Sequence, residues 1–248
     1  MLHSDETEEA DFPGPSLDYC PVSIAARLVG NKWTFLIVRE LLAGSIRFND
    51  IHRGVPSISR TLLASRLRDM TRDGLVTRLD ADSPNGVGYR LTPAAVALEP
   101  VIIALGNWAI DWRLPQTAIA DMETVKEDPS AALWHMFRSI DLTALPEGGL
   151  SMEFRFPESE PSCGWMAFDS HNRGSVCLGP PQVPADLVVI ANPGVLYQLA
   201  YGYVSCEHAL STGQISLEGD VALERRFQNF FSFSPFAERI SERVRGYR

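Results

Sequence analysis

The sequence predicts an α+β protein built from two domains. In the first half, apolar residues recur every three or four positions and a single strand pair interrupts them. In the second half, several alternating, strand-like segments are mixed with helical ones. The chain has 248 residues, of which 45% are hydrophobic and 21% charged, as is usual for folded proteins.

These changes of pattern divide the chain into four parts. We expect an acidic tail, a first domain, a polar connector and a second domain, at residues 1–15, 16–114, 115–127 and 128–248. At roughly 100–200 residues per domain, the length accommodates the two folded parts.

Four helices open the first domain, each with an apolar stripe. We place them at Val22–Val29, Trp33–Leu42, Arg47–Ile51 and Arg60–Arg72. Ser59 is a typical N-cap for the fourth, whose apolar stripe is formed by Leu62, Leu63, Leu67 and Met70.

A β-ribbon and a long helix complete this domain. Leu75–Leu79 and Val87–Leu91 are predicted strands joined by a turn at Ser83–Gly86. Thr92 and Pro93 then form an N-cap and first-turn proline pair, which opens a helix reaching Trp112. Short helices, an arginine-bearing helix, a ribbon and a long helix follow one another in the order of a winged helix-turn-helix.

Charge is distributed unevenly along the chain. The net charge of −9 argues against a nucleic-acid partner, yet residues 45–72 hold six arginines and only two acidic residues. Such a local surplus is expected of a phosphate-binding surface. A solvated helix face is the alternative that charge alone leaves open.

Many short segments of this half together carry a family resemblance. They are Cys20-Pro21-Val22, Gly30-Asn31-Lys32-Trp33, Arg39-Glu40-Leu41-Leu42, Arg47-Phe48-Asn49, Ile58-Ser59-Arg60, Leu63, Arg66-Leu67, Asp73-Gly74-Leu75-Val76 and Tyr89-Arg90-Leu91-Thr92. With these segments the chain resembles the HxlR-type winged helix-turn-helix regulators over residues 18–113. The resemblance implies a homodimer that binds double-stranded DNA.

The recognition helix of such a domain lies in the major groove and presents its N-terminal and outward side chains to the DNA. The candidates for DNA contact are Ser59, Arg60, Thr61, Ser65 and Arg68 on this helix, with Arg47, Arg78 and Arg90 outside it. Arg66 and Arg72 are expected to pair with Asp69 or Asp73 instead. Asp80 and Asp82 near the ribbon tip make phosphate contact less favourable there.

Cys20 is the residue of this half that has redox chemistry. Its position resembles that of the oxidant-sensing cysteine of some HxlR-type proteins, and Arg27 or Lys32 would activate it by proximity. The alternative is a small apolar residue packed at a dimer contact.

The second domain is predicted to mix a sheet with covering helices. The expected strands are Leu150–Phe156, Gly164–Phe168, Gly174–Leu178, Ala185–Ile190 and Ile215–Asp220. The expected helices are Pro129–Ile140, Asn192–Gly202 and Val221–Phe231.

Part of this half resembles the sterol-carrier-protein fold. The segments that carry the resemblance are Asp186–Val189, Asn192–Gly202, Ala209–Asp220 and the helix that follows. The resemblance spans residues 128–240 and implies a mostly antiparallel sheet, helices on one face and a pocket for an apolar small molecule. Phe227, Phe230 and Phe231 are candidates to line that pocket, and core packing is the alternative.

Other classes of function find little support. The chain has no G-x-S-x-G, H-E-x-x-H or phosphate-binding G-x-x-x-x-G-K-[ST] sequence, so we expect no enzyme and no cofactor. The spacing of Cys163, His171, Cys177, Cys206 and His208 matches no zinc module, so no metal is expected.

The cellular setting follows from similar absences. No apolar run approaches the ~20 residues that span a membrane, so we expect no membrane partner. The acidic N-terminus does not resemble a secretory signal, and the four cysteines show no pairing pattern, which together favour the cytoplasm.

These observations predict a dimeric DNA-binding regulator that recognises an inverted repeat and responds to an apolar effector in its second domain. Two alternatives stay open. In the first, the second domain serves only dimerisation or protein contacts. In the second, the protein is a lipid carrier whose helix-turn-helix binds no DNA.

Overall fold

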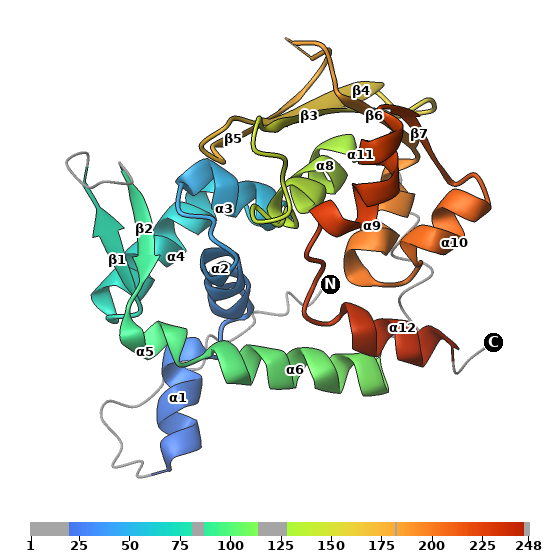
Figure 1. The fold of residues 1–248 in the computed structure, drawn as a ribbon. Coiled ribbons are helices and arrows are strands. Elements are labelled where there is room, and N and C mark those ends of the chain that lie inside the picture. Colours follow the sequence, from blue (N-terminus) through green and yellow to red (C-terminus); the bar gives the residue numbers. More distant parts are fainter. Residues whose placement is uncertain (1–19, 81–86, 114–127, 182, 246–248) are drawn as a thin grey trace, which may run out of the picture.

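The computed structural model describes residues 20–80, 87–113, 128–181 and 183–245. Two hydrophobic cores form, one on each side of residues 114–127, and the two parts pack against each other (Figure 1). The predicted acidic tail, ribbon turn and connector lie outside the described residues.

Four helices and a ribbon form the first part. The helices are α1 (Pro21–Val29), α2 (Lys32–Leu42), α3 (Phe48–Gly54) and α4 (Arg60–Arg72). The Ser59 hydroxyl accepts a hydrogen bond from the Leu62 amide at 3.2 Å, which confirms the predicted N-cap. Leu63, Leu67 and Met70 of α4 are buried in the core, whereas Leu62 is only half-buried. Strands β1 (Val76–Leu79) and β2 (Gly88–Leu91) pair antiparallel.

The predicted helix from Pro93 to Trp112 is divided into α5 (Pro93–Val96) and α6 (Glu99–Trp112). Pro100 lacks the amide hydrogen that would continue the helix by bonding to the Val96 carbonyl.

By length and composition, Pro93–Trp112 is the one segment among the described helices that is long and apolar enough to span a membrane. The expectation that no apolar run reaches this length is therefore wrong. In the structure α6 packs against α2 and against α12 (Ala237–Arg245).

A five-stranded sheet organises the second part. In spatial order its strands are β5 (Gly174–Leu178), β4 (Cys163–Phe168), β3 (Leu150–Arg155), β6 (Leu187–Ala191) and β7 (Ile215–Gly219). All neighbours are antiparallel except β3 and β6, which run parallel. Helices α8 (Pro129–Arg138) and α9 (Pro193–Tyr201) lie beneath one face of this sheet (Figure 1). This arrangement agrees with the predicted fold class.

The C-terminal segment departs from the prediction. Val221–Phe231 is not one amphipathic helix but α11 (Val221–Arg226) followed by the 3-10 helix η1 (Phe227–Phe230). With three residues per turn, η1 directs Phe227 and Phe230 to the same side, and both are buried in the core. Helices α10 (Cys206–Ser211) and α12 are also absent from the prediction.

Polar and aromatic contacts join the two parts. The Arg53 guanidinium of α3 lies 5.4 Å from the centre of the Trp134 ring of α8. On the other side of the junction, Arg239 of α12 donates to the Asp111 carboxylate of α6 at 2.7 Å. Gly106 of α6 faces the ring of Phe236 so closely that a Cβ there would overlap the ring.

Candidate nucleic-acid interface

Helix α4 carries most of the predicted DNA-contacting residues on its solvent-facing side. Ser59, Arg60, Thr61 and Arg68 are exposed and Ser65 is half-buried. The opposite side of the helix is fixed in the core by Leu63 and Leu67. The apolar stripe therefore orients the helix so that its polar face is accessible to a duplex.

The two outward arginines of α4 have different surroundings. Arg60 donates to the Asn49 side chain of α3 at 2.8 Å, and its guanidinium lies 5.3 Å from the centre of the Phe48 ring. Arg68 makes no hydrogen bond or ion pair with any residue that the structure describes. Arg60 is thus held in place before any ligand arrives, while the Arg68 fork is available to a phosphate or a guanine.

The remaining arginines of α4 are used within the helix, as predicted. Arg66 lies 3.7 Å from the Asp69 carboxylate. Arg72 lies 3.1 Å from Asp69 and 3.4 Å from Asp73. Exposed pairs of this kind contribute only about 0.3–0.5 kcal/mol, so they arrange charge rather than stabilise the fold.

The candidates outside α4 do not share one surface. Arg47 is exposed immediately before α3. In the ribbon, Arg78 is opposite Tyr89 and Arg90 is opposite Thr77, so the two arginines are on opposite faces of the strand pair. A duplex that meets one face of the ribbon reaches one of them directly. Asp82 lies outside the described residues.

Cys20 is exposed at the N-cap of α1. Hydrogen bonds from the backbone amides of Ser23 and Val22 lower the pKa of its thiol, so the activating groups are those of the helix N-terminus rather than the expected Arg27 or Lys32. Oxidant sensing by Cys20 stays a prediction. DNA binding by a Cys20→Ser variant under oxidant would test it.

The phenylalanine candidates of the second domain fall into two groups. Phe227 and Phe230 are fully packed in the core. Phe231 stacks on Phe233, and both line a cavity of about 360 Å³ that also contacts Cys206. The described residues that line this cavity include no arginine, lysine or histidine.

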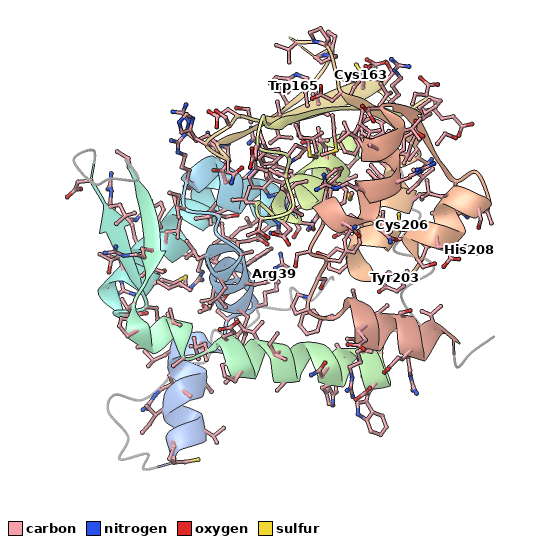
Figure 2. All side chains as sticks on the ribbon, viewed as in Figure 1. Arg39, Cys163, Trp165, Tyr203, Cys206 and His208 are labelled. Carbon is pink, nitrogen blue, oxygen red and sulfur yellow. The ribbon has the colours of Figure 1, made fainter. Side chains whose placement is uncertain are left out.

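The cysteine and histidine residues considered for zinc do not converge on one site. Figure 2 shows Cys163 on the sheet, whereas Cys206 and His208 are on α10, which packs against the edge strand β7. Among the residues that the structure describes, no three His, Cys, Asp or Glu side chains are grouped to hold a metal ion.

A buried charge cluster at the domain junction is absent from the sequence-based prediction. The Glu40 side chain of α2 is completely buried. It accepts hydrogen bonds from Arg39, at 2.7 and 3.0 Å, and from Arg138 of α8. Arg39 also donates to the Gly54 carbonyl at 2.9 Å, at the end of α3. The sequence does contain one indication of this cluster. Glu40 lies on the same apolar stripe of its helix as Leu36 and Ile37, where a carboxylate is expected to be buried and to need a partner.

His135 of α8 completes this cluster and is buried. Burial, together with the positive charges of Arg138 and Arg39, lowers the pKa of its imidazole to about 3. The ring is therefore neutral near pH 7. Arg138 Nη2 is 3.4 Å from Nδ1, and because a guanidinium only donates, we assign Nδ1 as the acceptor and Nε2 as the protonated nitrogen.

Comparison with known proteins gives a separate result for each half. Residues 28–117 match the HxlR-like helix-turn-helix family and residues 159–232 match the SCP-2 sterol transfer family, which confirms both resemblances. The HTH-type transcriptional regulator YdeP of Bacillus subtilis is 32% identical over 40% of this chain and 77% of its own length. YodB of the same organism, also an HTH-type transcriptional regulator, is 32% identical over 42% of this chain and 95% of its own. The solved structure of reduced YodB aligns with 33% identity over 39% of this chain and 96% of that one, with a TM-score of 0.35.

Proposed function

Because this chain belongs to the HxlR-like helix-turn-helix family of transcriptional regulators, we propose that it binds an inverted-repeat operator as a homodimer. In this proposal, α4 enters the major groove. A two-fold dimer places two such helices in successive grooves, about 34–36 Å apart along the duplex. The proposal includes a cytoplasmic location and no catalytic activity.

The observation that carries this proposal is the polar face of α4. It combines exposed Thr61, the positioned guanidinium of Arg60 and the unpaired guanidinium of Arg68. The net charge of the chain is −9, so this helix is a cationic surface on an acidic protein. Such a distribution favours approach of a duplex at one place and disfavours it elsewhere.

Exposed apolar side chains on two helices support the dimer. They are Val101, Leu105, Trp108 and Trp112, which form one stripe on α6, and Val22, Ile24 and Leu28 on α1. Trp112 alone is 69% exposed. An exposed apolar stripe of this kind marks an interface, and a self-complementary one gives a two-fold dimer.

DNA binding is tested by fluorescence anisotropy with the DNA upstream of the protein's own gene. We expect Arg60→Ala combined with Arg68→Ala to weaken binding by ten-fold or more and to reduce the slope of log K against log salt by about one to two. Arg225→Ala, an exposed arginine on α11, is the matched control and leaves binding unchanged. Binding that does not depend on salt, or that survives the double substitution, contradicts the proposal.

We further propose that the second domain binds an apolar small molecule that changes DNA affinity. Its match to the SCP-2 sterol transfer family and the cavity beside Phe231 support this. A thermal shift with apolar ligands separates it from a second domain that serves only protein contacts. If DNA binding fails while ligand binding succeeds, the lipid-carrier alternative is favoured.

A further inference from the structure

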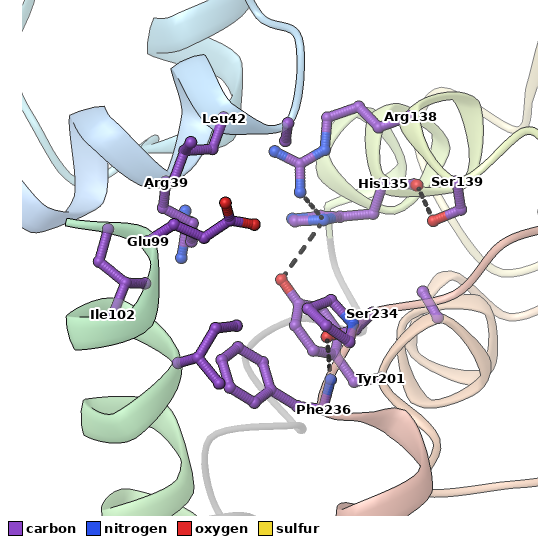
Figure 3. A pocket seen from close by; sticks show the side chains of 14 residues that line it. Arg39, Leu42, Glu99, Ile102, His135, Arg138, Ser139, Tyr201, Ser234 and Phe236 are labelled. Carbon is purple, nitrogen blue, oxygen red and sulfur yellow. Dashed lines mark hydrogen bonds between the residues drawn. The ribbon is translucent and has the colours of Figure 1, made fainter. Parts of the chain in front are cut away.

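A second cavity lies between the two domains rather than inside either one. It has a volume of about 310 Å³, at the lower end of small-molecule sites. Helices α2 and α6 of the first domain supply Arg39, Leu42 and Ile102, while the second domain supplies His135, Arg138, Tyr201 and Phe236 (Figure 3). A ligand here contacts both domains at once.

The polar part of the wall contains two guanidiniums, those of Arg39 and Arg138. Both bind the buried carboxylate of Glu40, and His135 is neutral. Glu99 also lines the cavity and is exposed, and Arg39 is partly exposed, so water screens both of these charges. Arg138 is therefore the least exposed charged side chain of the wall and the group best placed to bind an anion.

Hydrogen-bond donors also exceed acceptors in this wall. The one acceptor of the His135 ring, Nδ1, is contacted by Arg138 at 3.4 Å and by the Tyr201 hydroxyl at 3.5 Å. Since Nδ1 has a single lone pair, it satisfies one of them at most. A ligand oxygen that accepts a hydrogen bond would satisfy the donor that Nδ1 leaves unpaired.

The rest of the wall is apolar and aromatic. Leu42 and Ile102 of the first domain line the cavity together with Ile103, and the Phe236 and Tyr201 rings of the second domain lie across from Ile102 (Figure 3). Flat apolar ligands pack well against aromatic rings. None of the described residues that line the cavity beside Phe231 is cationic, so a ligand with an acidic group favours the cavity at the domain junction.

We propose that this cavity binds an aromatic monocarboxylic acid, with the carboxylate on Arg138 and Arg39 and the ring beside Phe236. Ligand binding at this cavity stands by itself, whereas its effect on regulation rests on the proposed function, DNA binding. Arg39 holds the Gly54 carbonyl at the end of α3, and α4 begins six residues later at Arg60. A carboxylate that binds the two arginines beside Glu40 changes this connection, and so changes DNA affinity.

Binding is tested by calorimetry on the full chain with 2-naphthoate and with 2-naphthamide, which has the same shape without the charge. We expect one naphthoate per chain, bound at least ten-fold more tightly than the amide. Arg138→Gln should abolish this preference while the amide still binds, which shows that the cavity is intact. Equal affinity for acid and amide in the unsubstituted protein overturns the proposal.

The location is tested with a substitution at the rim. Ala43→Trp fills the mouth of the cavity from an exposed position and should lower naphthoate affinity ten-fold or more. Ala94→Trp, also exposed but outside the cavity lining, is the matched control. Unchanged binding by Ala43→Trp overturns the assignment to this cavity.

Anisotropy with and without 2-naphthoate then tests the regulation. A change in DNA affinity that Ala43→Trp removes supports it. Naphthoate binding with unaltered DNA affinity overturns the regulatory step and leaves DNA recognition standing. Naphthoate binding by a protein that binds no DNA overturns the proposed function instead.

Discussion

At the scale of single residues, the charge cluster around Glu40 connects the two domains. A carboxylate without exposure to water is stable only when paired and hydrogen-bonded, and two arginines from different helices meet that need. Gly54 is part of this arrangement, because a Cβ at this position would overlap the Glu40 carboxylate. Removal of one partner leaves a buried charge, so these residues act as a unit.

His135 makes the stability of this junction depend on pH. The folded state keeps the imidazole neutral down to a pKa of about 3, whereas an unfolded chain protonates it near 6.5. The unfolded state therefore binds more protons between these values, and the free energy of unfolding falls as pH drops below about 6.5, by up to about 1.4 kcal/mol per pH unit.

Urea titrations between pH 4 and 8 measure this slope. His135→Asn should reduce it, and His171→Asn, at an exposed position, is the control. The same slope in His135→Asn and the unsubstituted protein would contradict the role given to His135.

At the scale of elements, α6 has two different apolar sides. One carries Val101, Leu105, Trp108 and Trp112 toward solvent. On the other, Gly106 faces Phe236 of the second domain, Ile102 and Ile103 line the junction cavity, and Ile102 also packs against the core of the first domain. A single helix therefore provides both the proposed dimer surface and a wall of the junction cavity, so a ligand in the cavity would contact the helix that carries this surface.

The contact between Gly106 and Phe236 provides a sharp test of this packing. Gly106→Ala should destabilise the protein by about 1–3 kcal/mol, because its methyl group overlaps the ring. In a Phe236→Ala background the same substitution should become neutral or stabilising by up to about 1 kcal/mol, since alanine favours helix. Denaturant unfolding of the four proteins measures the coupling. An equal cost in both backgrounds means that the two elements do not pack as described.

Elements with strong local signals were predictable, and those set by tertiary contact were not. The bounds of α4 and β5 agree with the sequence pattern because an N-cap, a regular apolar stripe or flanking turns fixed them locally. Helix α12 has Ile240 as its one fully buried residue, so its sequence carries little apolar signal. The 3-10 conformation of Phe227–Phe230 follows from the packing of both rings in the core, which the spacing of apolar residues in the sequence does not reveal.

The same distinction applies to the candidate sites. Outward positions on α4 follow from helical phase, so their exposure was predictable. The pairing of Arg60 with Asn49 and the cluster of Glu40 and Arg138 join residues far apart in sequence. No local pattern encodes such contacts, and the cavity that Arg138 lines was therefore missed.

At the scale of the whole molecule, the protein combines an arginine-bearing helix with an exposed polar face, an exposed apolar surface on α6 and a cavity at the junction between its two parts. Coupling between the cavity and DNA requires only that a ligand prefer one arrangement of the domains, and such preferences are typically ~1–3 kcal/mol. The cavity is lined by α2 and α6. Helix α2 packs against α4, and α6 carries the proposed dimer surface, so a bound molecule contacts neighbours of both.

The central claim is that two copies of α4 are presented together to a duplex. Selection of bound duplexes from a random-sequence pool tests it most directly. The account predicts an inverted repeat with half-site centres about 10–10.5 base pairs apart. Trp108→Glu, which places a charge in the dimer surface, should weaken selection of the paired site. Enrichment of a single half-site by the unsubstituted protein, or of no common sequence, would contradict the account.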